Sequence, residues 1–210
     1  MNALALSNPA ESGLVFLVDD DPSIRSGIDS LLRSMQLDVR CFASAAEFQR
    51  APRPDRPACL VLDIRMPGRS GLEFQRDLEE AGDIIPIIFL NAHGDIPMSV
   101  RAIKGGAIEF LTKPVDDQDL LDAIHAALEA ARERRAGAAA IGDLRSRYQA
   151  LTAREQEIMA KVVAGRLNKQ IAADLGVSEI TIKVSRGQLM RKMGANTLAD
   201  LVRMVERLRT

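Results

Sequence analysis

The sequence predicts an α/β domain followed by an all-α domain. Three observations carry this prediction. Short apolar runs alternate with segments of helical periodicity through the first 135 residues, helical periodicity alone follows Gly142, and the formal charge changes sign between the two parts. A chain of 210 residues is long enough for two domains, each with its own core.

Five apolar runs of strand length lie in the first part of the chain. They are rich in Val, Ile, Leu and Phe, which is typical of strands that are buried on both faces. The runs are LVFLV (14–18), LDVRCF (37–42), CLVL (59–62), IIPIIFL (84–90) and AIEFL (107–111).

Helical segments separate these runs. Pro22 suits the first turn of a helix. The apolar positions that define the predicted helices are Ile24, Ile28, Leu31 and Leu32, then Leu72 to Leu78, Met98 to Ile103, and Leu120, Leu121, Ile124 and Leu128. Alternation of strands and helices predicts a parallel sheet with helices on both sides. The last helix, from Asp116 to about Arg135, is expected to continue toward Tyr148 as a connector or a coiled-coil arm.

Four further helices are predicted in the last part of the chain. Thr152 and Glu155 form a capping box that begins the first of them, and Gly165 ends it. The expected boundary residues of the others are Asn168 as cap and Gly176 as end of the second, Ser178 as cap of the third, and Thr197 at the start of the fourth.

The net charge of −1 hides an asymmetry. From Asp143 onward the chain carries 13 Lys and Arg against 7 Asp and Glu, a charge of +6, whereas the preceding residues carry 15 against 22, a charge of −7. An acidic part joined to a basic part indicates a nucleic-acid-binding module at the end of the chain, although a merely solvated basic surface has the same charge.

Composition and motifs exclude several classes of protein. A chain with 47% hydrophobic and 27% charged residues is neither disordered nor collagen-like, and no apolar run reaches the roughly 20 residues of a membrane span. The first residues lack the basic and apolar regions of a secretory signal. Cys41 and Cys59 are too few for a disulfide scaffold or a zinc site, so we expect a reduced, cytoplasmic location and two small buried residues.

Polar side chains follow four of the predicted strands. Asp19, Asp20 and Asp21 come after the first strand, and the later ones are followed by Asp63, Asn91 and Lys113. Because the carboxyl ends of parallel strands share one edge of a sheet, these groups are expected to form one site.

The residue types predict the chemistry of this site. Clustered carboxylates without His or Cys favour a hard cation, Mg²⁺, that can bridge to a phosphate. A carboxylate can accept a phosphoryl group as an acyl phosphate, with Mg²⁺ and Lys113 neutralising the transferred oxygens. Asp63 is the best acceptor by position, because it stands alone at the end of a central strand.

The segments VDDD (18–21), LVLDIRMPG (60–68), HGDIPM (93–98) and EFLTKP (109–114) resemble the receiver domain of two-component response regulators. The resemblance implies a flavodoxin-like, doubly wound, five-stranded parallel sheet. It implies that Asp63 is the phosphoacceptor and that Lys113, next to a cis peptide before Pro114, pairs with the phosphoryl group. Phe110 fits the aromatic switch position. The implied Mg²⁺ ligands are Asp19, Asp20, Asp63 and the main-chain carbonyl of Arg65, with Asp19 acting through water.

Asn91 departs from the family pattern, which has Ser or Thr at this switch position. The amide can donate a hydrogen bond as a hydroxyl does, but it is longer and planar. We therefore expect Asp63 to be phosphorylated with an altered lifetime or weaker coupling. The alternative is a DNA-binding regulator with an atypical receiver that works independently of phosphorylation.

The segment NKQIAADLGVSEITIKVSRGQLMRKM (168–193) predicts a helix-turn-helix. Ile182, Ser185, Leu189 and Met193 share the face of the second helix that is expected to point inward. The opposite face is small, basic and amide-bearing, which fits a DNA major groove. The predicted DNA contacts are Lys169 and Thr181 to phosphates, and Lys183, Val184, Gly187, Gln188 and Arg191 on the outward face.

With LTAREQEIM in front and a fourth helix behind, this region resembles the LuxR-type DNA-binding domain, and the whole chain resembles a response regulator of the FixJ/NarL type. The implied domains are a receiver at 13–128, a helical linker at 129–147 and a DNA-binding domain at 148–210. The implied partners are a sensor histidine kinase, operator DNA and a second copy of the chain upon activation, with RNA polymerase as a candidate contact and no membrane. Ser185 departs from the His common in the family, so base preference does not carry over.

Competing interpretations are weaker. An aspartyl-phosphate phosphatase would need a second carboxylate two residues after Asp63, where this chain has Arg65, so no enzyme is expected. A nucleotide-binding protein is not expected, because the sequence has no GxxxxGK or GxGxxG loop. His93 and His125 lack a kinase-like context and are expected at the surface. The last part of the chain has one alternative, a small helical dimerisation module with a basic surface.

Overall fold

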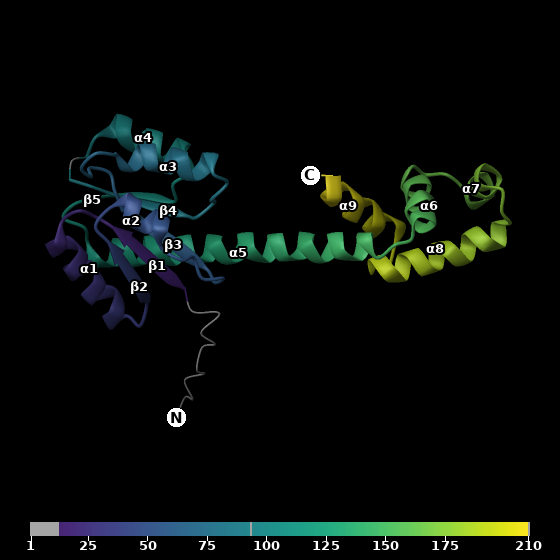
Figure 1. Ribbon diagram of the computed structural model, residues 1–210, viewed down its shortest axis with the longest axis horizontal. Helices are drawn as coiled ribbons and strands as arrows, with labels where there is room; N and C mark the ends of the chain where they lie inside the picture. Colours follow the sequence, from purple (N-terminus) through teal and green to yellow (C-terminus); the bar gives the residue numbers. More distant parts are fainter. Residues whose placement is uncertain (1–12, 93, 210) are drawn as a thin grey trace, which may run out of the picture. The chain divides into compact units, whose positions relative to one another are not determined.

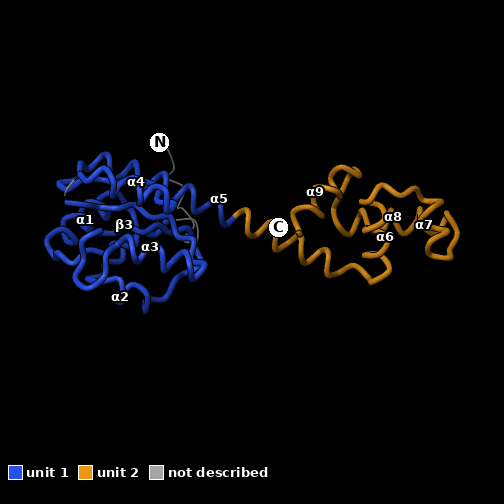
Figure 2. The backbone as a smooth tube through the Cα atoms, turned by 90° about the horizontal axis from the view of Figure 1, so that it is seen from above, with its two compact units in different colours: residues 1–135 blue, residues 136–210 orange. Residues whose placement is uncertain are grey.

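The structure is a computed structural model that describes residues 13–92 and 94–209. The chain divides into two compact units, residues 1–135 and 136–210 (Figure 2). Two predictions concern residues outside the described ranges. They are the lack of a secretory signal in the first residues and the surface position of His93. The helix Asp117–Gln149, α5, runs through the division between the two units.

The first unit contains a five-stranded parallel sheet. Its strands are β1 (Leu14–Val18), β2 (Asp38–Phe42), β3 (Ala58–Asp63), β4 (Ile87–Asn91) and β5 (Glu109–Thr112). They lie in the order β2-β1-β3-β4-β5, and every neighbouring pair is parallel. This order confirms the predicted flavodoxin-like, doubly wound fold. β4 begins three residues later than predicted, after Pro86, which has no backbone N–H to donate.

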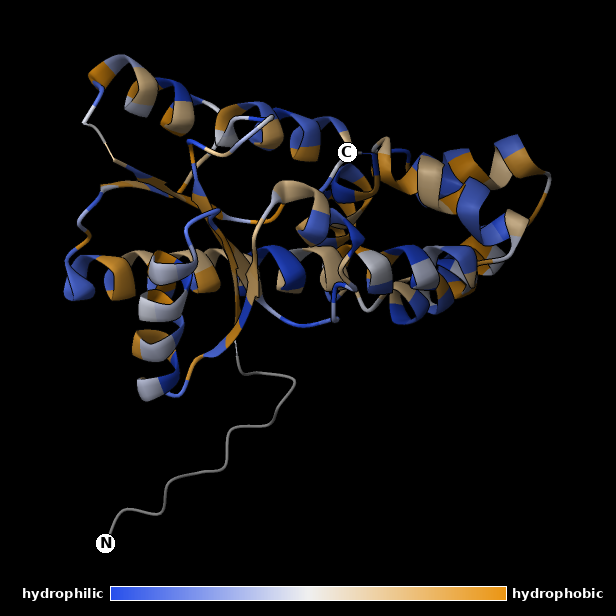
Figure 3. Cartoon of the chain, turned by 60° about the vertical axis from the view of Figure 1, so that its left-hand side comes forward, coloured by the Kyte–Doolittle hydropathy of each residue, from blue (hydrophilic) through white to orange (hydrophobic). Residues whose placement is uncertain are grey.

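Five helices cover the two faces of this sheet (Figure 1). They are α1 (Pro22–Ser34), α2 (Ala45–Arg50), α3 (Gly71–Glu80), α4 (Ile96–Lys104) and α5 (Asp117–Gln149). One apolar core joins α2, α3 and α4 to one face through residues such as Phe48, Phe74 and Ala102. A second core joins α1 and α5 to the other face through Leu32 and Ile124, among others. In Figure 3, hydrophobic colour runs along the strands, as expected of a sheet that is covered on both faces.

Local signals explain where the helices begin. The Asp21 carboxylate accepts a hydrogen bond from Ser23 N and caps α1, which has Pro22 at its first position. Ser70 and Glu73 form a capping box at α3. Helix α2 was not predicted from the sequence, because its six residues are too few to show a helical periodicity, although Ser44 caps it.

The second unit contains four helices besides the end of α5. They are α6 (Ala153–Val163), α7 (Asn168–Leu175), α8 (Glu179–Met193) and α9 (Leu198–Arg209). Their common core is built by thirteen buried residues, including Ile171, Ile182, Leu189 and Leu201. The predicted capping box of Thr152 and Glu155 and the Ser178 cap are both present.

Two local predictions are wrong. Asn168 does not cap α7; it is the first residue of that helix and accepts a hydrogen bond from Arg186 Nη1 at 3.2 Å, while Leu167 holds the cap position. The segment GAAAIG (137–142) lies within α5, so the predicted continuation of this helix toward Tyr148 is confirmed. Cys59 is buried as predicted, but Cys41 is exposed, because β2 is an edge strand.

His125 on α5 is exposed, as predicted. Among the described residues, no helix has both the length and the apolar character required to cross a bilayer. The limits 13–128, 129–147 and 148–210 of the three predicted segments stay predictions.

Candidate functional site

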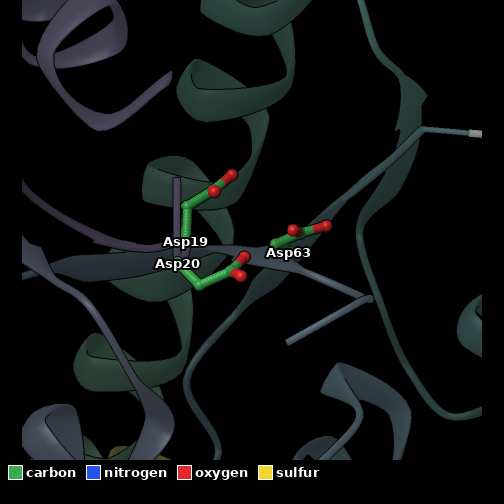
Figure 4. A group of neighbouring side chains, drawn as sticks. All are labelled: Asp19, Asp20 and Asp63. Atoms are coloured by element: carbon green, nitrogen blue, oxygen red, sulfur yellow. The ribbon is translucent and has the colours of Figure 1, made fainter. Parts of the chain in front are cut away.

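The predicted acidic site forms at the carboxyl edge of the sheet, where the strand order changes direction between β1 and β3. Val18 pairs with Leu62, so the next residues of the two strands, Asp19 and Asp63, leave the sheet at the same level. One carboxylate oxygen from each of Asp19, Asp20 and Asp63 lies within 4.8 Å of the others (Figure 4). Asp19 and Asp63 are buried, whereas Asp20 is exposed, so the cluster opens to solvent.

Lys113 reaches this cluster from the end of β5. Its Nζ lies 2.6 Å from Asp19 Oδ2 and 3.1 Å from Asp63 Oδ2. Burial alone lowers the pKa of Lys113, but hydrogen bonds and charge from Asp19 and Asp63 outweigh it and raise that pKa above its usual value. The ammonium is therefore firmly charged between the two carboxylates. The peptide between Lys113 and Pro114 is cis, as predicted.

Asp63 is the last residue of the central strand β3. Its Oδ1 accepts a hydrogen bond from Arg65 N at 3.3 Å. Burial raises the pKa of Asp63, and the charge of Asp19 adds to this effect, while Lys113 and the Arg65 amide oppose it. Gly71 passes close behind, since a Cβ at position 71 would lie 2.5 Å from the Asp63 carbonyl oxygen. The Asp63 carboxylate is thus oriented by its surroundings and lies next to the exposed Asp20.

Asn91 and Phe110 lie on the neighbouring strands β4 and β5. Asn91 is fully buried, and its Nδ2 donates to Met98 Sδ on α4 at 3.8 Å. Phe110 is partly buried against the core that contains α3 and α4. The two predicted switch residues therefore both border the α4 side of the sheet.

Two further residues contribute to this region and were not predicted from the sequence. Arg25 on α1 donates from Nη1 to the Asp19 carbonyl oxygen at 2.6 Å and fixes the end of β1. Met98 on α4 accepts the Asn91 hydrogen bond. Neither residue lies at a strand end, which was the signal that located the others.

The second unit presents a polar surface on α8. Ile182, Leu189 and Met193 are fully buried and Ser185 is partly buried, so the predicted inward face is confirmed. All seven predicted DNA contacts are exposed, namely Lys169 on α7 and Thr181, Lys183, Val184, Gly187, Gln188 and Arg191 on α8. An exposed helix face that carries small, basic and amide side chains can enter a major groove.

Comparison with known proteins identifies both units. Residues 15–125 match the family model of the response regulator receiver domain, and residues 149–205 match that of the LuxR family of bacterial regulatory proteins. The chain belongs to the two-component response regulators of the FixJ/NarL type.

Several relatives share this pair of domains along nearly their whole length. This response regulator is 51% identical to nodulation protein W of Bradyrhizobium diazoefficiens over 93% of its own chain and 86% of the relative. It is 40% identical to the transcriptional regulatory protein FixJ of Azorhizobium caulinodans, over 92% of each chain. The solved structure of the response regulator StyR has a TM-score of 0.82 at 48% identity, and the match covers 93% of this chain and 99% of that one.

The response regulator thus combines a receiver domain with a LuxR-type DNA-binding domain, and its relatives are transcriptional regulators. Its acidic cluster contains only oxygen ligands from carboxylates, which suits a hard divalent cation.

Proposed function

We propose that Asp63 of this response regulator accepts a phosphoryl group from the phosphohistidine of a sensor kinase and thereby controls sequence-specific DNA binding. The observation that carries this proposal is the Asp63 carboxylate at the end of β3, with Asp19 and Asp20 on one side and Lys113 at 3.1 Å. In the transfer, an Asp63 oxygen forms a bond to phosphorus while the phosphorus–nitrogen bond breaks and its electron pair stays on the kinase imidazole.

Asp19, Asp20, Asp63 and the Arg65 carbonyl oxygen are the proposed ligands of Mg²⁺. The bound ion would supply positive charge for the phosphoryl oxygens. Lys113 keeps its charge beside Asp63 and pairs with the transferred group. The backbone N–H of Arg65 donates to Asp63 Oδ1 and orients the carboxylate oxygen that is not paired with Lys113. A cytoplasmic location follows from the proposed kinase and DNA partners.

The switch is proposed to act through Asn91 and α4. The Asn91 amide donates to Met98 on α4, and it could donate instead to a phosphoryl oxygen. Ile96, Val100 and Ile103 form an apolar stripe on α4 at spacings of four and three residues, with exposed fractions of 76%, 45% and 47%. Exposed apolar surface of this kind supports a protein contact near Phe110, and we assign it to a second copy of the chain.

The DNA role is proposed for the exposed side of α8. Lys183, Val184, Gly187, Gln188 and Arg191 are the proposed groove residues, whereas Lys169 and Thr181 are proposed to contact phosphates. Lys183→Ala is expected to relax sequence preference, while Lys169→Ala is expected to weaken binding to all DNA similarly and to reduce the salt slope. If both variants lost the same affinity for the specific duplex as for the random duplex, these roles would be contradicted. RNA polymerase stays a candidate contact.

The phosphoryl proposal is tested with the full chain, Mg²⁺ and acetyl phosphate. Intact mass spectrometry should detect one phosphoryl group on the wild type and none on Asp63→Ala. Light scattering should then show dimers, and the treated protein should bind a selected duplex more tightly. If both proteins bind DNA equally well and ignore the donor, control is independent of phosphorylation. That outcome is the alternative that Asn91 favours, and Asn91→Thr should then restore the response.

A further inference from the structure

The end of α5 is built into the core of the second unit. Leu144 is buried and Tyr148 is partly buried in the same cluster as Ile182, Leu189 and Met193 of α8. These contacts fix the last turns of α5 against the inward face of the helix that we propose to read DNA.

Arg147 adds a directed contact on the same turns of α5. Its Nη1 donates to the carbonyl oxygen of Met193, the last residue of α8, at 3.1 Å. Its Nη2 pairs with Asp143 Oδ2 at 2.9 Å, one turn earlier on α5. The Asp143 carboxylate therefore holds the guanidinium in place while the guanidinium binds α8.

The hydrogen bond from Arg147 pairs the Met193 carbonyl group, which has no partner within α8. The last four carbonyl groups of a helix have no partner within the helix, and a cation near them is also favoured by the helix dipole. Gly194, which ends α8 with a φ of 74°, leaves room for this arrangement. A Cβ at position 194 would overlap Arg147 Nη1. Glycine suits this position because of its positive φ, and a larger residue would displace the end of the Arg147 side chain.

A second cation fixes the same end of α8. Lys192 Nζ donates to Glu155 Oε2 at 2.7 Å, and Glu155 belongs to the capping box at the start of α6. The carboxyl end of α8 is therefore attached to two helices, to α5 through Arg147 and to α6 through Lys192. Arg191, one of the proposed groove residues, directly precedes Lys192.

We propose that Arg147 is a positioning residue for DNA recognition, because it holds the carboxyl end of α8 against the end of α5. This inference rests on the proposed role of α8 in reading bases. Arg147 acts through α8, so its loss changes the angle at which Lys183, Gln188 and Arg191 meet the bases. Base contacts depend on that angle more strongly than phosphate contacts do, because they require bidentate geometry.

The test compares the full-length variants Arg147→Ala and Arg147→Lys with the wild type. Arg145→Ala is the matched control, because Arg145 is exposed on the same helix and makes no ion pair within the described part of the chain. Fluorescence anisotropy is measured on a duplex that the wild type selects from a random pool and on a random duplex, over a range of salt concentrations. Thermal unfolding is followed in parallel.

Arg147→Ala should weaken binding to the selected duplex about tenfold, the effect of a lost base contact, with less than about a threefold loss on random DNA. The salt slope should be unchanged, and Arg147→Lys should recover part of the loss, because it keeps the cation but not the fork that binds both partners. Arg145→Ala should weaken both duplexes equally and slightly.

Two results would overturn this role. Equal losses on both duplexes with a salt slope smaller by about one would make Arg147 a phosphate contact. An unchanged affinity of Arg147→Ala for the selected duplex would remove it from recognition. If Arg147→Ala does not fold, the test rests on Arg147→Lys. The proposal is then contradicted if that variant prefers the selected duplex over the random one as strongly as the wild type does. Failure of the wild type to select any duplex would instead contradict the proposed role of α8.

Discussion

Replacement of Lys113 by alanine tests the electrostatic account of the acidic site. The ammonium lies 2.6 Å from Asp19 and 3.1 Å from Asp63, and its side chain is 14% exposed. The variant leaves three carboxylates together with no ammonium between them. We expect the folded chain to lose stability at neutral pH, because two of these carboxylates are buried.

The expected magnitude follows from the burial of the three groups. Removal of one partner from a buried ion pair costs about 3–5 kcal/mol, whereas loss of a surface pair costs about 1 kcal/mol or less. Because Asp20 is exposed and the site is open to water, we expect the lower end, about 3 kcal/mol. A divalent cation should replace the lost charge. Mg²⁺ at about 100 times its Kd should return about 2.7 kcal/mol.

The assay is urea unfolding of both proteins at pH 7, with EDTA and with Mg²⁺. Lys104→Ala on the exposed side of α4 is the matched control and should change the free energy of unfolding by less than about 0.5 kcal/mol. A loss below about 1 kcal/mol for Lys113→Ala in EDTA would refute the buried-pair reasoning, because that is the range of a surface pair. A loss that Mg²⁺ does not reduce would refute the assignment of the carboxylates to a cation.

Three further predictions concern stability. The pKa of Asp63 is raised in the folded chain, so the contribution of this group to stability is complete below its unfolded pKa and is lost as pH rises through its folded pKa. Without Mg²⁺, the stability of Asp63→Asn relative to the wild type should therefore increase as pH rises above about 4, as urea unfolding can measure. Leu189→Ala should lower the free energy of unfolding of the second unit by about 2–5 kcal/mol, since Leu189 is fully buried, whereas Leu198→Ala, at a position 40% exposed, should cost much less; differential scanning calorimetry separates them. Gly142→Ala should stabilise α5 by up to about 1 kcal/mol, because a Cβ at this position meets no other atom within 4 Å. The helical circular dichroism signal should rise, and a loss of helix would contradict a continuous α5.

The receiver site was predictable because its residues follow a local rule. Asp19, Asp63, Asn91 and Lys113 each come at or directly after the end of a short apolar strand, and parallel strands deliver their carboxyl ends to one edge. The inward face of α8 was predictable for a similar reason, since the spacing of Ile182 and Leu189 is a property of one helix.

Other features depend on contacts between segments that are distant in the sequence. No local pattern places Met98 beside Asn91, Arg25 against the Asp19 carbonyl group, or Arg147 at the end of α8. Such contacts are decided by how helices pack on the sheet or on one another, so they are visible only once the elements are in place.

The sequence by itself determined which segments form the strands and the longer helices, where the carboxylates collect and which side of α8 faces outward. The tertiary structure decided the remainder. It formed α2 from six residues and exposed Cys41 on an edge strand. The physical reason is that periodicity and caps act within a few residues, whereas burial and hydrogen bonding in a folded chain join residues across its whole length.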